Sequence, residues 1–70
     1  MSFYGYMLQF LEEDPPRGDL ARDMLKDAEV ANLNGREELR DHFSRLSHGA
    51  TAVMNTFYRC WAAYKKEWLA

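Results

Sequence analysis

Apolar residues recur at helical spacing near the N-terminus of the chain. They occupy positions i, i+3, i+4, i+7 and i+8 of one stripe, which predicts a helix over residues 3–12. Ser2 is its expected N-cap, because the hydroxyl can accept a hydrogen bond from an unpaired N–H of the first turn. The two prolines that follow, Pro15 and Pro16, cannot donate backbone hydrogen bonds and therefore end the helix. The stripe consists of Phe3, Tyr6, Met7, Phe10 and Leu11.

Two shorter helices are predicted in the middle of the chain. One covers residues 20–29 with Asp19 as its N-cap, and the other covers residues 36–46. An Asn-Gly turn is expected between them, and Asn34 precedes Glu37 by three residues, which is the spacing of a capping box. The residues predicted to face the core are Leu20, Ala21, Met24, Leu25, Ala28, Leu39, Phe43 and Leu46, together with Leu33 from the turn.

The last predicted helix covers residues 50–69 and is the longest. A break at residues 47–49 precedes it, and its apolar positions again follow helical spacing. No strand-like alternation, internal repeat or low-complexity segment occurs in the sequence. We therefore predict an all-α fold, a compact four-helix bundle in which residues 1–70 form a single domain. The expected inward residues of the last helix are Val53, Met54, Phe57, Cys60 or Trp61, Tyr64 and Trp68.

Aromatic residues are concentrated at the two ends of the chain. Nine of the ten aromatics lie in residues 3–10 and 57–68, and only Phe43 lies between these segments. A chain of 70 residues cannot leave this much aromatic surface in water, so the first and last helices are expected to pack on each other. The content of hydrophobic residues, 47%, likewise indicates a packed core rather than disorder.

Cys60 is the only cysteine, so an intramolecular disulfide is excluded and a reducing compartment is favoured. We interpret this residue as a small buried hydrophobe. No apolar run approaches the ~18–20 residues that cross a bilayer, and the N-terminus lacks the pattern of a secretory signal. The sequence is thus typical of a cytoplasmic protein that has no membrane partner.

The net charge of −2 is unevenly distributed along the sequence. Residues 1–29 carry three basic and seven acidic residues, a net charge of −4, whereas residues 30–70 carry six basic and four acidic residues, a net charge of +2. Solvated helix faces with ion pairs one turn apart would account for this pattern. The alternative is a dipolar molecule that presents one basic face to a polyanion.

Two motifs resemble those of a known family. Residues 2–8 read SFYGYML and are similar to the SFYxYLL opening of the YozE family, and residues 54–64 read MNTFYRCWAAY and are similar to its MxTFxxAWxxY close. The family consists of small bacterial proteins, chiefly of Gram-positive bacteria, and the resemblance implies a compact helical bundle similar to sterile alpha motif (SAM) domains. The chain departs from the family at residues 32–35, where a Phe-Pro loop is common, and at residues 58–60, where acidic residues are frequent. Because the family is largely uncharacterised, the resemblance implies a fold rather than an activity.

Candidate catalytic or metal-binding residues are few. A nucleophilic pair of Cys60 with a histidine would need an orienting group and an oxyanion hole, and no metal-ligand spacing such as CxxC or HxxxH occurs. We expect His42 to lie at a solvated rim of the bundle. His48 is expected at the exit of the third helix, where a cationic side chain interacts well with the helix dipole. We therefore predict no enzyme activity, cofactor, metal or small-molecule substrate.

The remaining candidate function is binding through a surface. Tyr4, Tyr58 and Trp68 can lie outside the core stripes, and aromatic residues are enriched at protein interfaces. We therefore predict a protein–protein interaction module whose partner is a second copy of the chain or an unidentified protein. The alternative is a nucleic-acid-binding accessory protein that contacts phosphates through a basic face. The residues of that face would be Arg36, Arg40, Arg45, Lys65 and Lys66.

Overall fold

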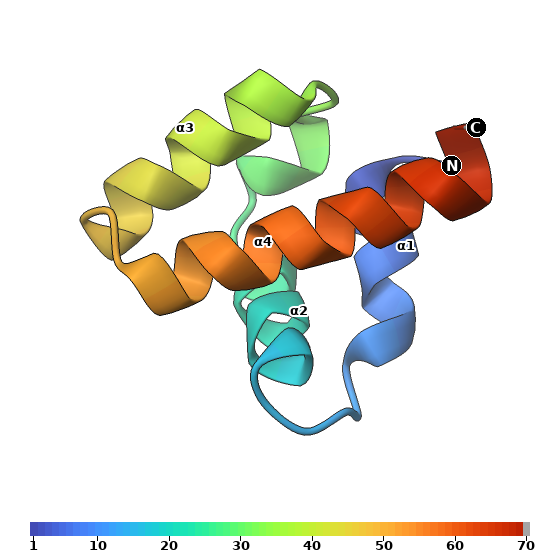
Figure 1. Ribbon diagram of the computed structural model, residues 1–70, viewed down its shortest axis with the longest axis horizontal. Coiled ribbons are helices and arrows are strands. Elements are labelled where there is room, and N and C mark those ends of the chain that lie inside the picture. Colours follow the sequence, from blue (N-terminus) through green and yellow to red (C-terminus); the bar gives the residue numbers. More distant parts are fainter. Residues whose placement is uncertain (70) are drawn as a thin grey trace.

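Within residues 1–69, four α-helices linked by short turns surround one aromatic core (Figure 1). The computed structural model describes residues 1–69, and no strand occurs in that part of the chain. The prediction of an all-α, four-helix fold is therefore confirmed. The α-helices are α1 (Phe3–Met7), α2 (Arg17–Lys26), α3 (Arg36–Ser47) and α4 (Thr51–Tyr64), the 3₁₀ turns are η1 (Leu8–Phe10) and η2 (Val30–Asn32), and the π-helical turn is η3 (Lys65–Leu69).

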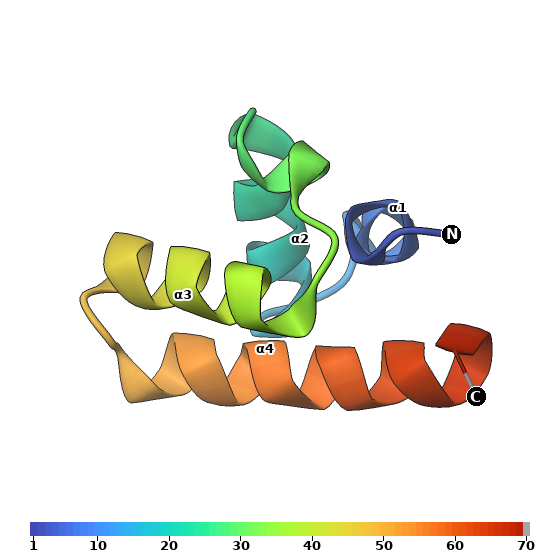
Figure 2. The ribbon, with the colours of Figure 1, turned by 90° about the horizontal axis from the view of Figure 1, so that it is seen from above.

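The longest helix, α4, is the element against which the other helices pack. Figure 2 shows α3 running antiparallel along the N-terminal part of α4. The same view places α1 near the C-terminal part of α4, and α2 also contacts α4. The core therefore lies between α4 and the layer formed by the other three helices.

The first helix begins where the sequence predicts. The Gly5 amide donates a hydrogen bond to Ser2 Oγ over 3.0 Å, so Ser2 is the N-cap. From Leu8 the helix tightens into the 3₁₀ turn η1, which ends at Phe10 rather than at the predicted residue 12. Short 3₁₀ segments are frequent at the ends of α-helices.

The two ends of the chain pack together through a cluster of aromatic rings. The centroid of the Phe3 ring lies 5.6 Å from that of Phe57 and 5.3 Å from that of Trp61. Phe3 also makes an edge-to-face contact with Tyr64 at 5.6 Å, and the Tyr6 and Tyr64 rings are 5.3 Å apart. Ring pairs at these distances are favourable because the positive edge of one ring meets the negative face of another. The predicted contact between the first and last helices is confirmed.

The start of α2 corrects the sequence prediction. The helix begins at Arg17 after an N-cap at Pro16, so Asp19 lies in the first turn and does not cap it. A proline is well tolerated here because the first N–H groups of a helix have no partner within the helix. Gly18 packs closely on the preceding loop, and a Cβ at this position would lie 1.8 Å from the Glu13 carbonyl oxygen. This close approach of α2 to the loop requires glycine.

The end of α2 comes three residues earlier than predicted, at Lys26. Asp27 is the extended C-cap, and its Oδ1 accepts a hydrogen bond from the Glu29 amide over 3.0 Å. An aspartate that bonds the backbone two residues ahead favours a turn over a helix. Ala28 is consequently exposed, and Val30 at the start of η2 is buried in the core, which the sequence analysis did not predict. Leu33 packs against the core from the following turn, as predicted.

The third helix has nearly the predicted extent but a different N-cap. Gly35 occupies the N-cap position without a side-chain hydrogen bond, so the predicted Asn34 cap is wrong. At the other end, His48 adopts a left-handed conformation with φ 55°, and the Gly49 amide donates to the Ser44 carbonyl over 2.8 Å. This pattern is a Schellman-type helix end. The predicted position of His48 at the helix exit is confirmed.

Three large residues predicted to face the core are exposed instead. Leu25 and Leu46 are 52% and 61% exposed, because each lies in the last turn of its helix and projects beyond the core. Trp68 is also 52% exposed. It lies in the π-helical turn η3, whose wider i→i+5 geometry rotates the side chains that follow away from the stripe of α4.

Two tyrosine hydroxyls tie the last residue of α4 and the turn η3 to the N-terminal segment. The Tyr64 hydroxyl donates to the Met1 carbonyl oxygen, and the Tyr6 hydroxyl donates to a carboxylate oxygen of Glu67. Burial of Tyr6, together with this carboxylate, raises the pKa of the Tyr6 hydroxyl to about 12. The two termini consequently lie at the same end of the molecule (Figures 1 and 2).

Candidate interaction surfaces

The five basic residues of the predicted nucleic-acid face do not share one side of the molecule. Arg36 and Arg45 are nine residues apart on α3, which places them about 180° apart around the helix axis. The Arg36 guanidinium lies 5.2 Å from the centre of the Tyr58 ring on α4. Arg45 instead lines a recess beside His42, at the opposite side of α3.

The other three basic residues lie at two separate places, Arg40 on α3 and the neighbours Lys65 and Lys66 in η3. Arg40 pairs with the neighbouring Asp41, with Nη2 and Oδ1 3.1 Å apart. Lys65 and Lys66 lie in η3, beyond the part of α4 that α3 covers (Figure 2). Lys66 lines a recess next to Tyr6, on the side of α1. Nucleic-acid binding thus stays a prediction, and these five basic residues do not form a common face that would support it.

The three aromatic residues of the predicted protein interface are spread as well. Tyr4 is partly buried and packs against the core. Tyr58 is 38% exposed and lies under the Arg36 guanidinium. Of the three, only Trp68 has another exposed large apolar residue, Leu69, beside it in the same turn.

We call Met1, Trp68 and Leu69 the terminal patch. Their side chains are 66%, 52% and 56% exposed, respectively, and Trp68 and Leu69 lie in η3, directly after the Tyr64 residue whose hydroxyl bonds to the Met1 carbonyl oxygen. This hydrogen bond holds the N-terminal residue near the start of η3. A group of exposed apolar side chains is typical of an interaction site.

A second surface, which we call the acidic groove, lies between α2 and the N-terminal part of α4. Its cavity volume is about 250 Å³. The buried side chains of Leu20 and Thr56 line its floor, whereas the carboxylates of Asp19 and Asp23 are exposed and lie one helical turn apart. Asp19 also pairs with Arg22, with Oδ1 and Nη2 2.6 Å apart. The other lining residues are Pro15, Pro16, Ala52 and Val53.

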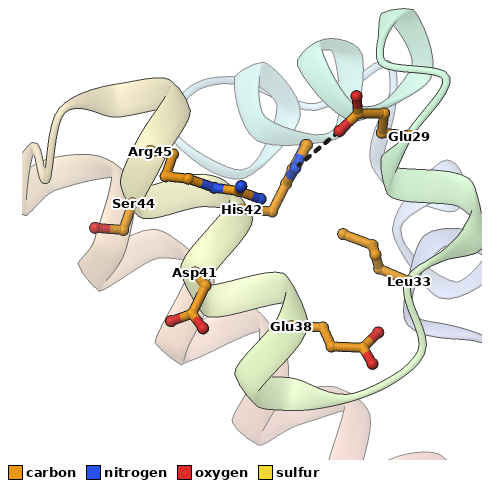
Figure 3. A pocket seen from close by; sticks show the side chains of 7 residues that line it. All are labelled: Glu29, Leu33, Glu38, Asp41, His42, Ser44 and Arg45. Atoms are coloured by element: carbon orange, nitrogen blue, oxygen red, sulfur yellow. Dashed lines mark ion pairs between the residues drawn. The ribbon is translucent and has the colours of Figure 1, made fainter.

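A buried histidine joins α3 to the segment that follows α2 (Figure 3). The His42 side chain is 5% exposed, and its Nε2 lies 2.6 Å from Asp27 Oδ2. Its Nδ1 lies 3.7 Å from Glu29 Oε2. The expectation of a solvated rim position was wrong, because the segment containing η2 folds back over α3 and covers the ring. The hydrogen bond from His42 holds the pKa of Asp27 below its usual value.

The recess beside His42 is open and mixed in charge. It has a volume of about 580 Å³, and the Ser44 hydroxyl points away from the imidazole (Figure 3). Among residues 1–69, no group of three or more His, Cys, Asp and Glu side chains is arranged to hold a metal ion. The contacts of His42 bind the η2 segment to α3, which is a structural role. The charged residues that line the recess are Glu29, Glu38, Asp41 and Arg45.

Cys60 is a free thiol buried in the core on α4. Burial raises the pKa of this thiol, which disfavours the nucleophilic thiolate. The interpretation of Cys60 as a small buried hydrophobe is confirmed.

A comparison with protein families identifies a family with this architecture. The family model described as YozE SAM-like fold matches residues 2–66 of the 70-residue chain. The chain belongs to the YozE SAM-like family. The match spans both motifs that resemble YozE proteins, and the family's SAM-like fold agrees with the four helices around one core. No curated protein and no solved structure matches the chain. Within residues 1–69, no helix is both long enough and apolar enough to cross a bilayer.

The sequence did not predict two features of this YozE-family domain. The acidic groove combines residues from α2 and α4, which are far apart in the sequence. Its only local signal is the helical spacing of Asp19 and Asp23 beside the proline pair. The His42–Asp27 contact joins residues 15 positions apart on different elements, so no short motif could reveal it.

Proposed function

We propose that this protein is a non-enzymatic, cytoplasmic protein-interaction module that engages its partner through the terminal patch. The observation that carries the proposal is the exposure of Met1, Trp68 and Leu69 at one end of a domain whose core holds most of its aromatic side chains. The cytoplasmic location is supported by the single cysteine, which is a free thiol.

The terminal patch has the physical properties of a binding site. Complete burial of one large apolar side chain contributes about 1.5–3 kcal/mol, so covering the patch would supply a useful part of a binding free energy. Tryptophan is among the residues most enriched at the energetic centres of interfaces. The hydrogen bonds of Tyr64 to Met1 and of Tyr6 to Glu67 hold the patch on an ordered support. A preorganised surface loses less conformational entropy on binding.

The residues with potential for catalysis support the same function. Cys60 is buried with a raised pKa, and the His42 ring is held between the carboxylates of Asp27 and Glu29. Neither side chain therefore has the exposure and the base partner that a nucleophilic site needs. The dispersed basic residues, in turn, favour a protein partner over a nucleic acid.

Site-specific photo-crosslinking tests the proposal. A photoreactive phenylalanine analogue would replace Trp68, and its adducts would be identified in the native cells by mass spectrometry. The matched control carries the analogue at Asn55, which is exposed on α4 outside both surfaces. We expect a defined protein adduct at position 68, with either a second copy or another protein. A yield at position 68 no higher than at position 55 would contradict the proposal.

A further inference from the structure

The terminal patch and the acidic groove are complementary in charge and in polarity. The groove has an apolar floor bordered by the exposed carboxylates of Asp19 and Asp23. The terminal patch offers two exposed apolar side chains, Trp68 and Leu69, next to the ammonium group of Lys65 in the same turn. Both surfaces are thus apolar with a charged edge. The edge is positive in the terminal patch and negative in the acidic groove.

We infer that the terminal patch of one copy of the chain docks into the acidic groove of a second copy. This inference rests on the proposed function, because it takes the terminal patch as the interaction site and names its partner. In the docked arrangement the Trp68 side chain covers the groove floor formed by Leu20 and Thr56 and contacts Val53 at its side. The Lys65 ammonium then lies beside the carboxylate of Asp23.

The spacing of the residues on both sides fits this arrangement. Lys65 and Leu69 are four residues apart in the π-helical turn η3, which is close to one full turn of its i→i+5 geometry, so they lie on the same side of it, and Trp68 is the neighbour of Leu69. On α2, Asp19 and Asp23 are in positions i and i+4, so both carboxylates border the groove along one helix. A turn of cationic and apolar side chains can therefore lie along a groove whose acidic edge is about one turn long.

The two surfaces cannot meet within one molecule. Val53 lies near the start of α4 and Trp68 lies beyond its end, and 15 residues at a rise of 1.5 Å span about 22 Å. Figure 1 shows α4 beginning beside the end of α3 and extending past α2 to the end of the molecule where the N-terminus lies. Each copy can thus give its patch to one neighbour and its groove to another, which builds open chains or closed rings.

The charge distribution favours this head-to-tail contact over a symmetric one. A symmetric pairing of two terminal patches would bring Lys65 and Lys66 of both copies together. The carboxylate of Glu67 in the same turn offsets only one of these two positive charges, so the turn keeps a net positive charge. Like charges placed together at an interface disfavour that pairing, whereas the groove supplies the opposite charge.

The association is expected to be weak and sensitive to salt. Because one short turn of side chains fills a groove of about 250 Å³, we expect a contact area below the ~1,200 Å² of a standard interface and a Kd on the order of 100 µM. Exposed ion pairs are screened by salt, which should weaken the contact further at moderate ionic strength. The test therefore follows the full chain from about 20 µM to about 1 mM by sedimentation velocity, at low and at moderate salt. The weight-average mass should rise with protein concentration and fall with salt.

Single variants locate the two surfaces. We expect Trp68→Ala and Asp23→Lys each to weaken the association at least about tenfold. The matched control for the first is Leu46→Ala, which removes an equally exposed apolar side chain outside both surfaces. The control for the second is Glu12→Lys, which makes the same charge change at another exposed position. Both controls should associate like the unmodified chain. All four positions are exposed, and far-UV circular dichroism checks that each variant is folded.

A mixing experiment separates specific docking from non-specific attraction. The Trp68→Ala variant retains an intact groove, and the Asp23→Lys variant retains an intact patch. Each variant alone should sediment as a monomer. An equimolar mixture should form 1:1 dimers that grow no further, because each pair has one competent patch and one competent groove.

Three results would overturn the inference. They are an unmodified chain that stays monomeric up to about 1 mM, an equal loss of association in the Leu46→Ala control, and a mixture that remains monomeric. A monomeric chain combined with a specific crosslink from position 68 to another protein would refute self-association and leave the proposed function intact. A monomeric chain without any such crosslink would refute both.

Discussion

The two tryptophans of the chain lie seven residues apart and have opposite surroundings. Trp61 on α4 is 9% exposed, and its ring centroid lies 5.3 Å from that of Phe3 and 5.2 Å from that of Tyr64. Trp68 in η3 is 52% exposed. Both residues fit the same apolar stripe in the sequence. The difference teaches that periodicity predicts the direction of a side chain, whereas burial also requires a helix packed opposite to it.

The two tryptophans thus have different roles, Trp61 in the stability of the fold and Trp68 in the proposed binding. Trp61 lies in the aromatic cluster that joins the two ends of the chain, so it belongs to the folded core. Trp68 lies in the terminal patch, where its side chain remains available for a partner. Substitutions at the two positions should therefore affect different measurements.

The largest expected effect is on folding, from Trp61→Ala. Truncating a large core side chain costs about 3–5 kcal/mol, which is comparable to the whole stability of a domain of this size. Trp68→Ala should change the free energy of unfolding by less than about 0.5 kcal/mol, as is usual for surface substitutions. Urea unfolding followed by circular dichroism measures both values. Similar losses in the two variants would contradict the comparison.

A smaller effect is expected at the contact that holds η3 in place. Tyr6→Phe removes the hydrogen bond to Glu67 and should cost about 1 kcal/mol. Because the folded-state pKa of Tyr6 is raised from 10.0 to about 12, its contribution is complete below pH 10 and is lost as the pH rises toward 12. Unfolding free energies measured on the alkaline side should thus decline less steeply in Tyr6→Phe than in the unmodified chain. Equally steep declines of the unfolding free energy in the two proteins would show that the Tyr6 hydroxyl does not cause this pH dependence.

The contact between α3 and the η2 segment should respond to acid instead. The pKa of Asp27 lies below its usual 3.8 because of the hydrogen bond from His42. The contribution of this carboxylate is therefore present above pH 3.8 and is lost as the pH falls through the lowered folded-state value. Asp27→Asn should cost about 1 kcal/mol at neutral pH, and its difference from the unmodified chain should shrink in acid. Urea midpoints at neutral pH and below pH 3.8 provide the test, and a constant difference would refute it.

The smallest effect is expected from nucleic acids. Arg36 and Arg45 lie on opposite sides of α3, so no saturable binding of short single- or double-stranded DNA or RNA is expected. An NMR titration of labelled protein at low and at moderate salt makes this measurement. Salt-sensitive shifts clustered at Arg36, Arg40 and Arg45 would instead support the nucleic-acid alternative.

The sequence predicted the parts of this fold that depend on local pattern. Apolar spacing located the four helices, and the aromatic residues at both ends predicted that the first and last helices pack on each other, as Phe3 and Trp61 do. The Ser2 cap and the end of the third helix at His48 follow from residues within a few positions in the sequence. Burial of Cys60 follows from its position beside the stripe of α4.

The remaining features depend on contacts between distant segments. Nothing near His42 in the sequence indicates that Asp27 will cover it, and Val30 enters the core only because α2 ends early. The π-helical turn that rotates Trp68 outward has no signal in the apolar pattern. The sequence therefore predicted that the candidate site is an aromatic surface. It did not predict which residues form that surface. Of Tyr4, Tyr58 and Trp68, the structure keeps only Trp68 in an exposed apolar group.

The most direct test of the central claim, that Trp68 is a binding residue, uses Trp68 as its own reporter. The chain has two tryptophans, so Trp61→Phe leaves Trp68 as the only indole while retaining an aromatic ring in the core. Acrylamide quenching of its fluorescence would be measured as the protein concentration rises. We predict efficient quenching in dilute solution that decreases as copies associate and returns when salt is added. Equally efficient quenching at every concentration would contradict the docking of Trp68 on a second copy.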